Sequence, residues 1–448
     1  MNDKIDKPVS FKPGPKSQEL MKIRDQNVAR GISQVMPVFV KETKGAILVD
    51  VDGNEFIDFA GGIGVTNFGY NHPAIVEAIK KQADQYLHTC CMVTMYEPYV
   101  QLAAKLNSFT PGDFPKKTAF FNSGAEAVEN SIKLARRFTK KTAIVALEGA
   151  FHGRTLMTMT LTSRVKPYKY GFGPFAPDVY KIPAPYCYRC RFGITYPACE
   201  LHCARYLEQF FAVECTADNV AAVIAEPVQG EGGFVVPPLD YFKILHEICR
   251  RNDVLLILDE IQSGFYRTGS SLASYYYQVE PDLITMAKSL AGGVPISALT
   301  GRAEVMDAAG PGEIGGTYGG NPLGCAAALA VFATAEKEQI EPKAKKTGSI
   351  AAERLELMKE KYAIIGDHRG LGAMQAIELV KDRTTKEPAP EAAKAIIKRC
   401  HDRGLIIITA GIFSNVIRIL MPVNISSEQL NKGFDILEEA IAEEQGGR

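Results

Sequence analysis

The stretch Val254-Leu-Leu-Ile-Leu-Asp-Glu-Ile-Gln-Ser-Gly-Phe265 decides the fold that we expect for this chain. Its unbroken apolar beginning predicts a strand buried on both faces, which is typical of parallel sheets covered by helices. The carboxylates of Asp259 and Glu260 follow this strand directly. Ligands of parallel α/β sheets bind beyond the carboxyl ends of the strands, so we expect Asp259 at a binding site.

Similar apolar runs alternate with amphipathic helical stretches, and together they predict an α/β fold with a largely parallel sheet over residues 66–330. These runs are Thr118–Phe121, Thr142–Leu147, Val220–Ala225 and Leu283–Met286.

Both chain ends are expected to form a second, smaller α+β domain, from residues 1–65 and 331–448. Near the N-terminus, the alternating residues of Ala46–Phe59 around Asp52-Gly53 predict a hairpin. Near the C-terminus, we expect helices at 323–338 and 349–361 and short strands at 372–379 and 416–420.

The composition excludes several classes of partner. Lys plus Arg equals Asp plus Glu at 51 each, so no net field attracts nucleic acid or an anionic membrane. No apolar run approaches the roughly 20 residues that span a bilayer, and Met1–Lys16 has no apolar core of a signal peptide. The ten cysteines are mostly scattered, which favours a reducing compartment. We therefore expect a cytoplasmic protein that binds small molecules.

Two further segments could carry chemistry. In Phe120–Ala127 a strand leads through a small turn into a helix, where the N–H groups of Gly124 and Ala125 could hold a phosphate; the alternative is an empty turn. In Pro281–Gly293, Lys288 follows another apolar strand. Apolar surroundings and nearby cations would lower its pKa and make it an amine nucleophile, whereas the alternative is a solvated lysine.

The acidic pair after the central strand could also hold magnesium beside a nucleotide. No Gly-Lys-Ser/Thr phosphate loop precedes it, which argues against a nucleotide enzyme.

Taken in this order, the segments closely resemble the class III (ω) aminotransferases of pyridoxal-phosphate (PLP) fold type I. The resemblance extends from the Asp52-Gly53 turn through Asn71-His-Pro73 to the C-terminal part, and within the class it is greatest to 4-aminobutyrate aminotransferases. It implies an aspartate aminotransferase-like fold and the cofactor pyridoxal 5'-phosphate.

The resemblance also implies roles for individual residues. Lys288 would form a Schiff base with the cofactor and carry a proton, and Asp259 would pair with the ring nitrogen. Thr317 would contact the cofactor of a partner subunit, which implies a homodimer or a dimer of dimers. The remaining expected cofactor-binding residues are Ser123, Gly124 and Ala125 at the phosphate, Phe151 and His152 at the ring, and Gln262 near the ring hydroxyl.

Four residues match substrate-binding positions of the 4-aminobutyrate enzymes. Arg154 would hold the carboxylate of an ω-amino acid, and Arg418 the α-carboxylate of glutamate or 2-oxoglutarate. Glu231 would pair with Arg418 when the substrate has no α-carboxylate, and Ile63 would form an apolar wall. For each, the alternative is a structural or surface contact.

These roles predict a ping-pong transaminase that moves the amine of an ω-amino acid such as 4-aminobutyrate to 2-oxoglutarate. Several alternatives stay open: a racemase or epimerase of the same fold, ornithine-like, 5-aminovalerate or β-alanine donors, and pyruvate as acceptor. A binding protein without turnover is disfavoured, because Lys288 and Asp259 are both present.

One segment departs from this pattern. Cys187, Cys190, Cys199 and Cys203 are spaced C-x2-C-x8-C-x3-C, which could hold structural zinc or an iron–sulfur cluster. The alternatives are buried small residues or disulfides, and we assign no metal. The insert also marks a branch of the class that includes racemases and epimerases.

Overall fold

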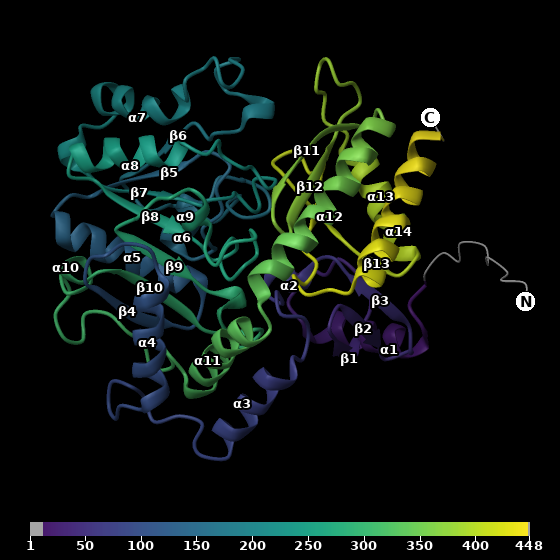
Figure 1. Cartoon of the computed structure of the whole chain (residues 1–448), viewed down its shortest axis with the longest axis horizontal. Coiled ribbons are helices and arrows are strands. Elements are labelled where there is room, and N and C mark those ends of the chain that lie inside the picture. Colours follow the sequence, from purple (N-terminus) through teal and green to yellow (C-terminus); the bar gives the residue numbers. More distant parts are fainter. Residues whose placement is uncertain (1–11, 447–448) are drawn as a thin grey trace, which may run out of the picture.

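The structure is a computed structural model that describes residues 12–446. Its centre is a seven-stranded sheet in the order β4-β10-β9-β8-β7-β5-β6 (Figure 1). All neighbouring strands pair in parallel except β10, which runs against both β4 and β9. The strands are β4 (Lys116–Phe121), β5 (Ala143–Leu147), β6 (Val179–Ile182), β7 (Val220–Ala225), β8 (Leu255–Asp259), β9 (Leu283–Met286) and β10 (Ser297–Arg302).

Both faces of this sheet are covered, as its apolar sequence predicts. Alternate residues of β5 enter different cores: Val145 packs with α7 (His202–Val213) and α8 (Tyr241–Arg251), while Ile144 packs with α5 (Gly124–Thr139). A strand that is buried on both faces has few positions for a polar side chain, so most of its residues are apolar. The chemistry is therefore confined to the ends of the strands.

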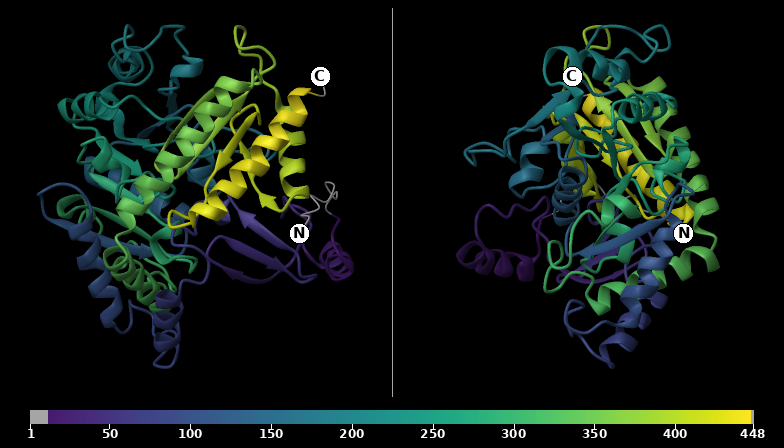
Figure 2. Two further views of the ribbon diagram at one scale, coloured as in Figure 1. Left: turned by 45° about the vertical axis from the view of Figure 1, so that its right-hand side comes forward. Right: turned by 90° about the vertical axis from the view of Figure 1, so that its left-hand side faces the viewer.

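A second sheet, of four antiparallel strands, lies beside the first in the order β11-β12-β15-β14. Three long helices cover one of its faces, and the other face is turned toward the seven-stranded sheet (Figure 2). These elements are β11 (Ile365–Leu371), β12 (Met374–Leu379), β14 (Ile408–Ala410), β15 (Val416–Ile419), α12 (Ile340–Lys361), α13 (Pro390–Asp402) and α14 (Ser427–Gly446).

A third sheet joins the two ends of the chain. The hairpin of β2 (Ile47–Asp50) and β3 (Glu55–Asp58) is extended by β1 (Val40–Lys44) on one side and by β13 (Leu405–Ile406) on the other. The Asp50 carboxylate closes the hairpin turn by accepting from the N–H groups of Asp52 and Asn54 at 2.9 and 2.8 Å.

The remaining helices connect or flank the sheets. They are α1 (Pro15–Asn27), α2 (Gly61–Gly64), α3 (Pro73–Ala83), α4 (Glu97–Phe109), α6 (Leu156–Leu161), α9 (Ala273–Tyr276), α10 (Ala303–Met306), α11 (Pro322–Lys337), and the 3₁₀ turns η1 (Cys187–Arg189), η2 (Ala217–Asn219) and η3 (Lys288–Ala291).

The hairpin, the five apolar strands, and the two C-terminal strands are confirmed to within a few residues. The helix expected at 349–361 begins nine residues earlier, because Pro342 occupies its first turn, where a missing N–H costs no hydrogen bond. The limits of the two domains stay a prediction. Between residues 12 and 446, no helix combines the length and the apolar character that crossing a bilayer requires.

Candidate active site

A cavity of about 370 Å³ lies at the carboxyl ends of four strands of the large sheet. Ser123 follows β4, Glu226 follows β7, Asp259 ends β8 and Lys288 follows β9. These four strands are parallel, so their carboxyl ends share one edge and bring the polar residues together.

The start of α5 forms the wall of the cavity next to β4. Ser123 caps the helix by accepting from the Glu126 N–H at 3.3 Å, and the Glu126 carboxylate accepts from the N–H of Ser123 at 3.1 Å. This capping box leaves the N–H groups of Gly124 and Ala125 without a bond to any residue of the described chain. Two free N–H groups at a helix N-terminus can bind an anion.

Asp259 is held rigidly at the base of the cavity. Its Oδ1 accepts from the Thr285 hydroxyl at 3.0 Å and the Ile261 N–H at 3.2 Å, and its Oδ2 lies 2.7 Å from His152 Nδ1. Asp259 is 3% exposed. A buried carboxylate in such a fixed position can stabilise a positive charge in the cavity.

Lys288 has the properties of an amine nucleophile. Burial, together with the nearby charge of Arg418, lowers the pKa of Lys288 to about 8 against the attraction of Glu231. Its φ of +48° is a left-handed conformation that costs a non-glycine residue about 1–3 kcal/mol. The lowered pKa that the sequence predicts is therefore confirmed, and the strained backbone fixes where the amine projects.

Two polar atoms beside the cavity are buried and unpaired. Gln262 Oε1 and His152 Nε2 have no hydrogen-bond partner within residues 12–446. A buried polar atom without a partner costs about 1–3 kcal/mol, so both atoms are suited to a polar ligand. Phe151 adds an aromatic ring to the same wall.

Glu231 and Arg418 form a buried ion pair where the two sheets meet. Arg418 Nη1 donates to Glu231 Oε1, and the Tyr168 hydroxyl donates to Glu231 Oε2 at 3.1 Å. Burial acts to raise the pKa of Glu231, but Arg418, Lys288 and the Tyr168 hydroxyl together outweigh burial and lower that pKa. Arg418 Nε is buried without a partner in the described chain, so the guanidinium has a free N–H group that could donate to a second carboxylate.

The structure places four predicted residues, Arg154, Ile63, Thr317 and Arg418, outside the lining of the main cavity. Arg154 is exposed and stacks on the Tyr168 ring, with 4.9 Å from its Cζ to the ring centroid. Ile63 lines a separate hollow that Arg418 also borders. Thr317 is exposed on the segment before α11. The other predicted site residues, Ser123, Gly124, Ala125, Phe151, His152, Glu231, Asp259, Gln262 and Lys288, line the cavity.

Residues 28–441 match the family described as aminotransferase class-III. The chain belongs to the class III aminotransferases. It is 47% identical over 418 residues to a probable 4-aminobutyrate aminotransferase of Bacillus subtilis, covering 93% of this chain and 96% of that protein. It is 42% identical to a 5-aminovalerate aminotransferase of Pseudomonas aeruginosa, covering 95% and 99%.

Solved structures agree with this assignment. A Bacillus anthracis aminotransferase superimposes on this class III aminotransferase with a TM-score of 0.88 at 30% identity, covering 95% of this chain and 98% of that one. An amine transaminase of an uncultivated Pseudomonas species, solved in its PLP-bound form, superimposes with a TM-score of 0.86 at 28% identity, covering 93% and 98%. The predicted PLP fold type I is confirmed.

Sequence reasoning missed two residues of this aminotransferase site. Burial and the charge of Asp259 raise the pKa of Glu226 to about 8, and its carboxylate accepts from the N–H groups of Phe151 and Gly230, both at 2.9 Å. Glu226 follows an apolar strand just as Asp259 does, so the same signal could have found it. Tyr168 lies in a connecting segment whose sequence gives no such signal.

The four clustered cysteines of this aminotransferase line a hollow of about 20 Å³ beside η1 and α7. All four are free thiols, and Cys187 is exposed while the others are partly exposed. Burial and the neighbouring thiols raise the pKa of Cys203 to about 12. No three His, Cys, Asp or Glu side chains between residues 12 and 446 are arranged to hold a metal ion.

Proposed function

We propose that this class III aminotransferase transfers the amino group of an ω-amino acid, such as 4-aminobutyrate or 5-aminovalerate, to 2-oxoglutarate with pyridoxal 5'-phosphate. The observation that carries the proposal is the Glu231–Arg418 pair, of which Glu231 lines the cavity that contains Lys288. The names of the relatives, 4-aminobutyrate and 5-aminovalerate aminotransferases, support the same donors.

The residues of the cavity fit the cofactor. The free N–H groups of Gly124 and Ala125, with Ser123, would hold its phosphate, and Phe151 would lie against its ring. The unpaired Gln262 Oε1 would accept from the ring hydroxyl. When bound, the cofactor supplies an electron sink for the carbon that loses a proton.

Asp259 and Lys288 would do the chemistry at opposite ends of the ring. Asp259, fixed by Thr285 and the Ile261 N–H, would hold a proton on the ring nitrogen, and His152 would keep its carboxylate oriented. Lys288 would attach the cofactor as a Schiff base. The Lys288 Nζ would also take up the proton that the substrate carbon loses and give it back.

Glu231 and Arg418 would let one site accept two unlike substrates. With an ω-amino acid bound, the carboxylate lies toward Arg154, and Glu231 neutralises Arg418. With 2-oxoglutarate or glutamate bound, the α-carboxylate displaces Glu231, because the bidentate guanidinium fits a carboxylate well. Ile63 would form an apolar wall beside Arg418.

An absorbance spectrum of the purified enzyme tests this proposal. We expect 4-aminobutyrate, added without an oxo acid, to shift the band of the lysine-bound cofactor, and 2-oxoglutarate to restore it. A band that does not respond to 4-aminobutyrate or 5-aminovalerate would contradict the proposed donors. An α-amino acid that racemises without an oxo acid would favour the epimerase alternative instead.

Subunit contacts are a further part of the proposal: the enzyme is a homodimer or a dimer of dimers, and Thr317 reaches the partner's cofactor phosphate. Exposed apolar residues support this, since Tyr318 follows Thr317, and Met92 lies against Gly315. Val93 and Met95 extend the same exposed apolar surface. The compartment we propose is the cytoplasm, and ten free cysteines are typical of such a reducing environment.

Mixing two inactive variants tests the shared site. Lys288→Ala and Thr317→Asp should each be inactive as homodimers, because the first lacks the amine and the second repels the phosphate. Subunits exchanged under mild denaturant should regain activity, since one site of each hybrid keeps Lys288 from one chain and Thr317 from the other. Mixtures that stay inactive, although mass spectrometry shows hybrids, would contradict a role for Thr317 across the interface.

A further inference from the structure

A charged layer lies between the small sheet and the large one, next to the Glu231–Arg418 pair. Strand register places Arg369 of β11 opposite Ala376 of β12, and Ala376 opposite Arg418 of β15. Residues directly opposite in a sheet project from the same face, and so do residues two apart in one strand. Arg369, Arg418 and Glu378 therefore share the face that is turned toward the large sheet.

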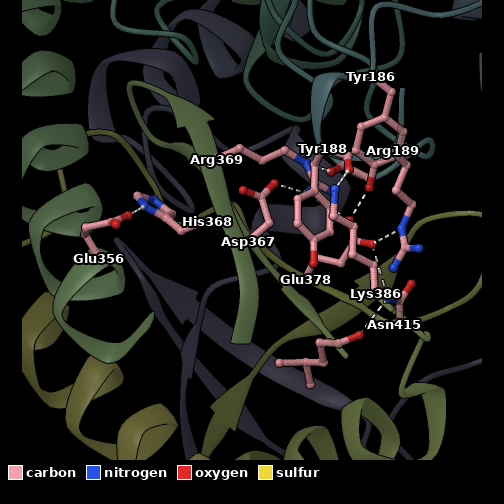
Figure 3. Close-up of polar contacts among 12 residues, drawn as sticks. Tyr186, Tyr188, Arg189, Glu356, Asp367, His368, Arg369, Glu378, Lys386 and Asn415 are labelled. Carbon is pink, nitrogen blue, oxygen red and sulfur yellow. Dashed lines mark hydrogen bonds and ion pairs between the residues drawn. The ribbon is translucent and has the colours of Figure 1, made fainter. Parts of the chain in front are cut away.

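Glu378 is the centre of this layer, as Figure 3 shows. It is 1% exposed and accepts from Arg369 Nη1 at 2.8 Å, from Arg189 Nε and from the Tyr186 hydroxyl. Arg369 Nη1 also lies 2.7 Å from Asp367. Asn415 Nδ2 also donates to Glu378 at 3.3 Å. A buried carboxylate with four donors fixes its partners strongly, because an unpaired charge there would be costly.

Arg369 connects this layer to the turn that carries Glu231. Its Nε donates to the backbone oxygen of Gly233 at 2.8 Å. The turn is closed by paired N–H···O bonds between Gln229 and Val235, at 3.1 and 3.2 Å, and Glu231 lies within it. A Cβ on Gly233 would lie 3.1 Å from Arg369 Nη2, so the guanidinium packs directly against the backbone of the turn.

We propose that Arg369, held by Glu378, is a positioning residue that keeps Glu231 on Arg418 and thereby sets the balance between the two substrate classes. The role rests on the proposed function of Glu231 and Arg418. While the turn is held, Glu231 competes with a substrate carboxylate for Arg418. A looser turn shifts the population toward a free Arg418, which binds dicarboxylates more tightly. Donors without an α-carboxylate then react less well, because they leave that guanidinium unpaired.

Binding of glutarate to the holoenzyme tests this balance without turnover, since glutarate has two carboxylates but no amino or oxo group. The variant is Arg369→Lys, which keeps the charge but lacks the fork that spans Gly233 and Glu378. We expect its glutarate Kd, measured by calorimetry, to fall about tenfold, the change for one lost charge-assisted hydrogen bond. The matched control is Arg354→Lys, which weakens ion pairs to Asp435 and Glu438 among the helices. The Kd of the Arg354→Lys variant for glutarate should equal that of the wild type.

The two half-reactions give a second readout. In Arg369→Lys, the kcat/KM for 4-aminobutyrate should fall about tenfold while that for 2-oxoglutarate is kept or rises, whereas a merely structural role would lower both together. Glu378→Gln should also lower the kcat/KM for 4-aminobutyrate relative to that for 2-oxoglutarate. It replaces Arg369→Lys as the test if that variant does not fold. An unchanged glutarate Kd, or equal losses in both half-reactions, would overturn the proposal. If the wild type binds glutarate but transaminates neither substrate, the proposed function fails, and the calorimetry still decides the role of Arg369.

Discussion

Lys288 combines a lowered pKa with a strained backbone, and both follow from its place after a buried strand. Burial disfavours the ammonium form, so the amine is neutral at a pH at which a solvent-exposed lysine would be charged. The neutral amine is the nucleophile toward an aldehyde. The site therefore has a reactive group before any substrate arrives.

The pH dependence of cofactor capture follows from this pKa. When cofactor-free enzyme is mixed with pyridoxal phosphate, the rate of Schiff-base formation should rise with pH and level off above about 8. An ordinary lysine would continue to gain reactivity up to about pH 10.4. Stopped-flow absorbance from pH 6 to 10 measures the rate, and Lys288→Ala is the control without capture. A rate that still climbs above pH 9 would show that burial does not lower the pKa.

Glu226 should be a strong determinant of stability. Glu226→Ala leaves the N–H groups of Phe151 and Gly230 without their acceptor in a buried place. We expect the free energy of unfolding to fall by about 1–3 kcal/mol for each unpaired group. Urea denaturation measures this, with Glu247→Ala, an exposed glutamate of α8, as the control. Equal stabilities of the two variants would contradict the inferred role.

Whether a site residue could be predicted from the sequence depended on where it lies in the fold. Asp259 and Lys288 could be found because each follows an apolar strand, and the strand fixes where the side chain lies. Arg369 could not be found, because its importance comes from one backbone oxygen of Gly233, more than a hundred residues earlier in the chain. Contacts of this kind depend on how two sheets pack against each other, and the local sequence pattern of a strand does not specify that packing.

Among the elements, α5 has the closest link between local structure and function. Its capping box satisfies the N–H groups of Ser123 and Glu126 and leaves those of Gly124 and Ala125 free. Gly124 packs closely at this turn, because a Cβ there would lie 2.7 Å from Ile261 Cδ1 and 3.3 Å from Ile261 Cγ2.

Substitution of Gly124 tests this link. In Gly124→Val the branched side chain should push the start of the helix away from Ile261, and overpacking of this kind costs about 1–3 kcal/mol. We expect the Kd for pyridoxal phosphate to rise at least about tenfold, since both N–H groups move. Equilibrium dialysis measures the Kd. Gly31→Val, where nothing lies within 4 Å of the added Cβ, should bind as the wild type does. Equal Kd values for both variants would sink the idea.

The elements also show why some of the fold escaped prediction. Short apolar runs such as those of β7 and β8 can be found from the sequence, because such runs are typical of strands that are buried on both faces. Nothing in Ser297–Arg302 marks β10 as antiparallel within a parallel sheet. The early start of α12 was hidden by Pro342 and by Gly348, which packs against the backbone of Gly372.

At the scale of the whole molecule, Arg267 joins parts of the chain that are distant in sequence. Its guanidinium is 0% exposed and donates to Asn67 Oδ1 at 3.0 Å, to the Ala373 oxygen at 2.9 Å and to the Met421 oxygen at 2.6 Å. Asn67 precedes the large sheet, Ala373 lies in the turn between β11 and β12, and Met421 follows β15. The Arg267 side chain therefore links the large sheet to the small one.

Replacement of Arg267 should loosen the molecule as a whole. Arg267→Leu leaves three buried acceptors unpaired, so we expect a loss of about 3 kcal/mol or more in the free energy of unfolding. Scanning calorimetry would record a lower Tm, with Arg30→Leu on the surface as the control. A Tm within the error of the control would show that packing alone holds the sheets together.

The pairing of β13 with β3 has a consequence for biosynthesis. Leu405 pairs with Ile57, so the strand that completes the N-terminal sheet leaves the ribosome long after the hairpin has emerged. At about 5–20 residues per second, the hairpin waits on the order of 20–70 s with an unpaired edge. An exposed strand edge is a template for wrong pairing, so this interval is when the nascent chain most needs a chaperone.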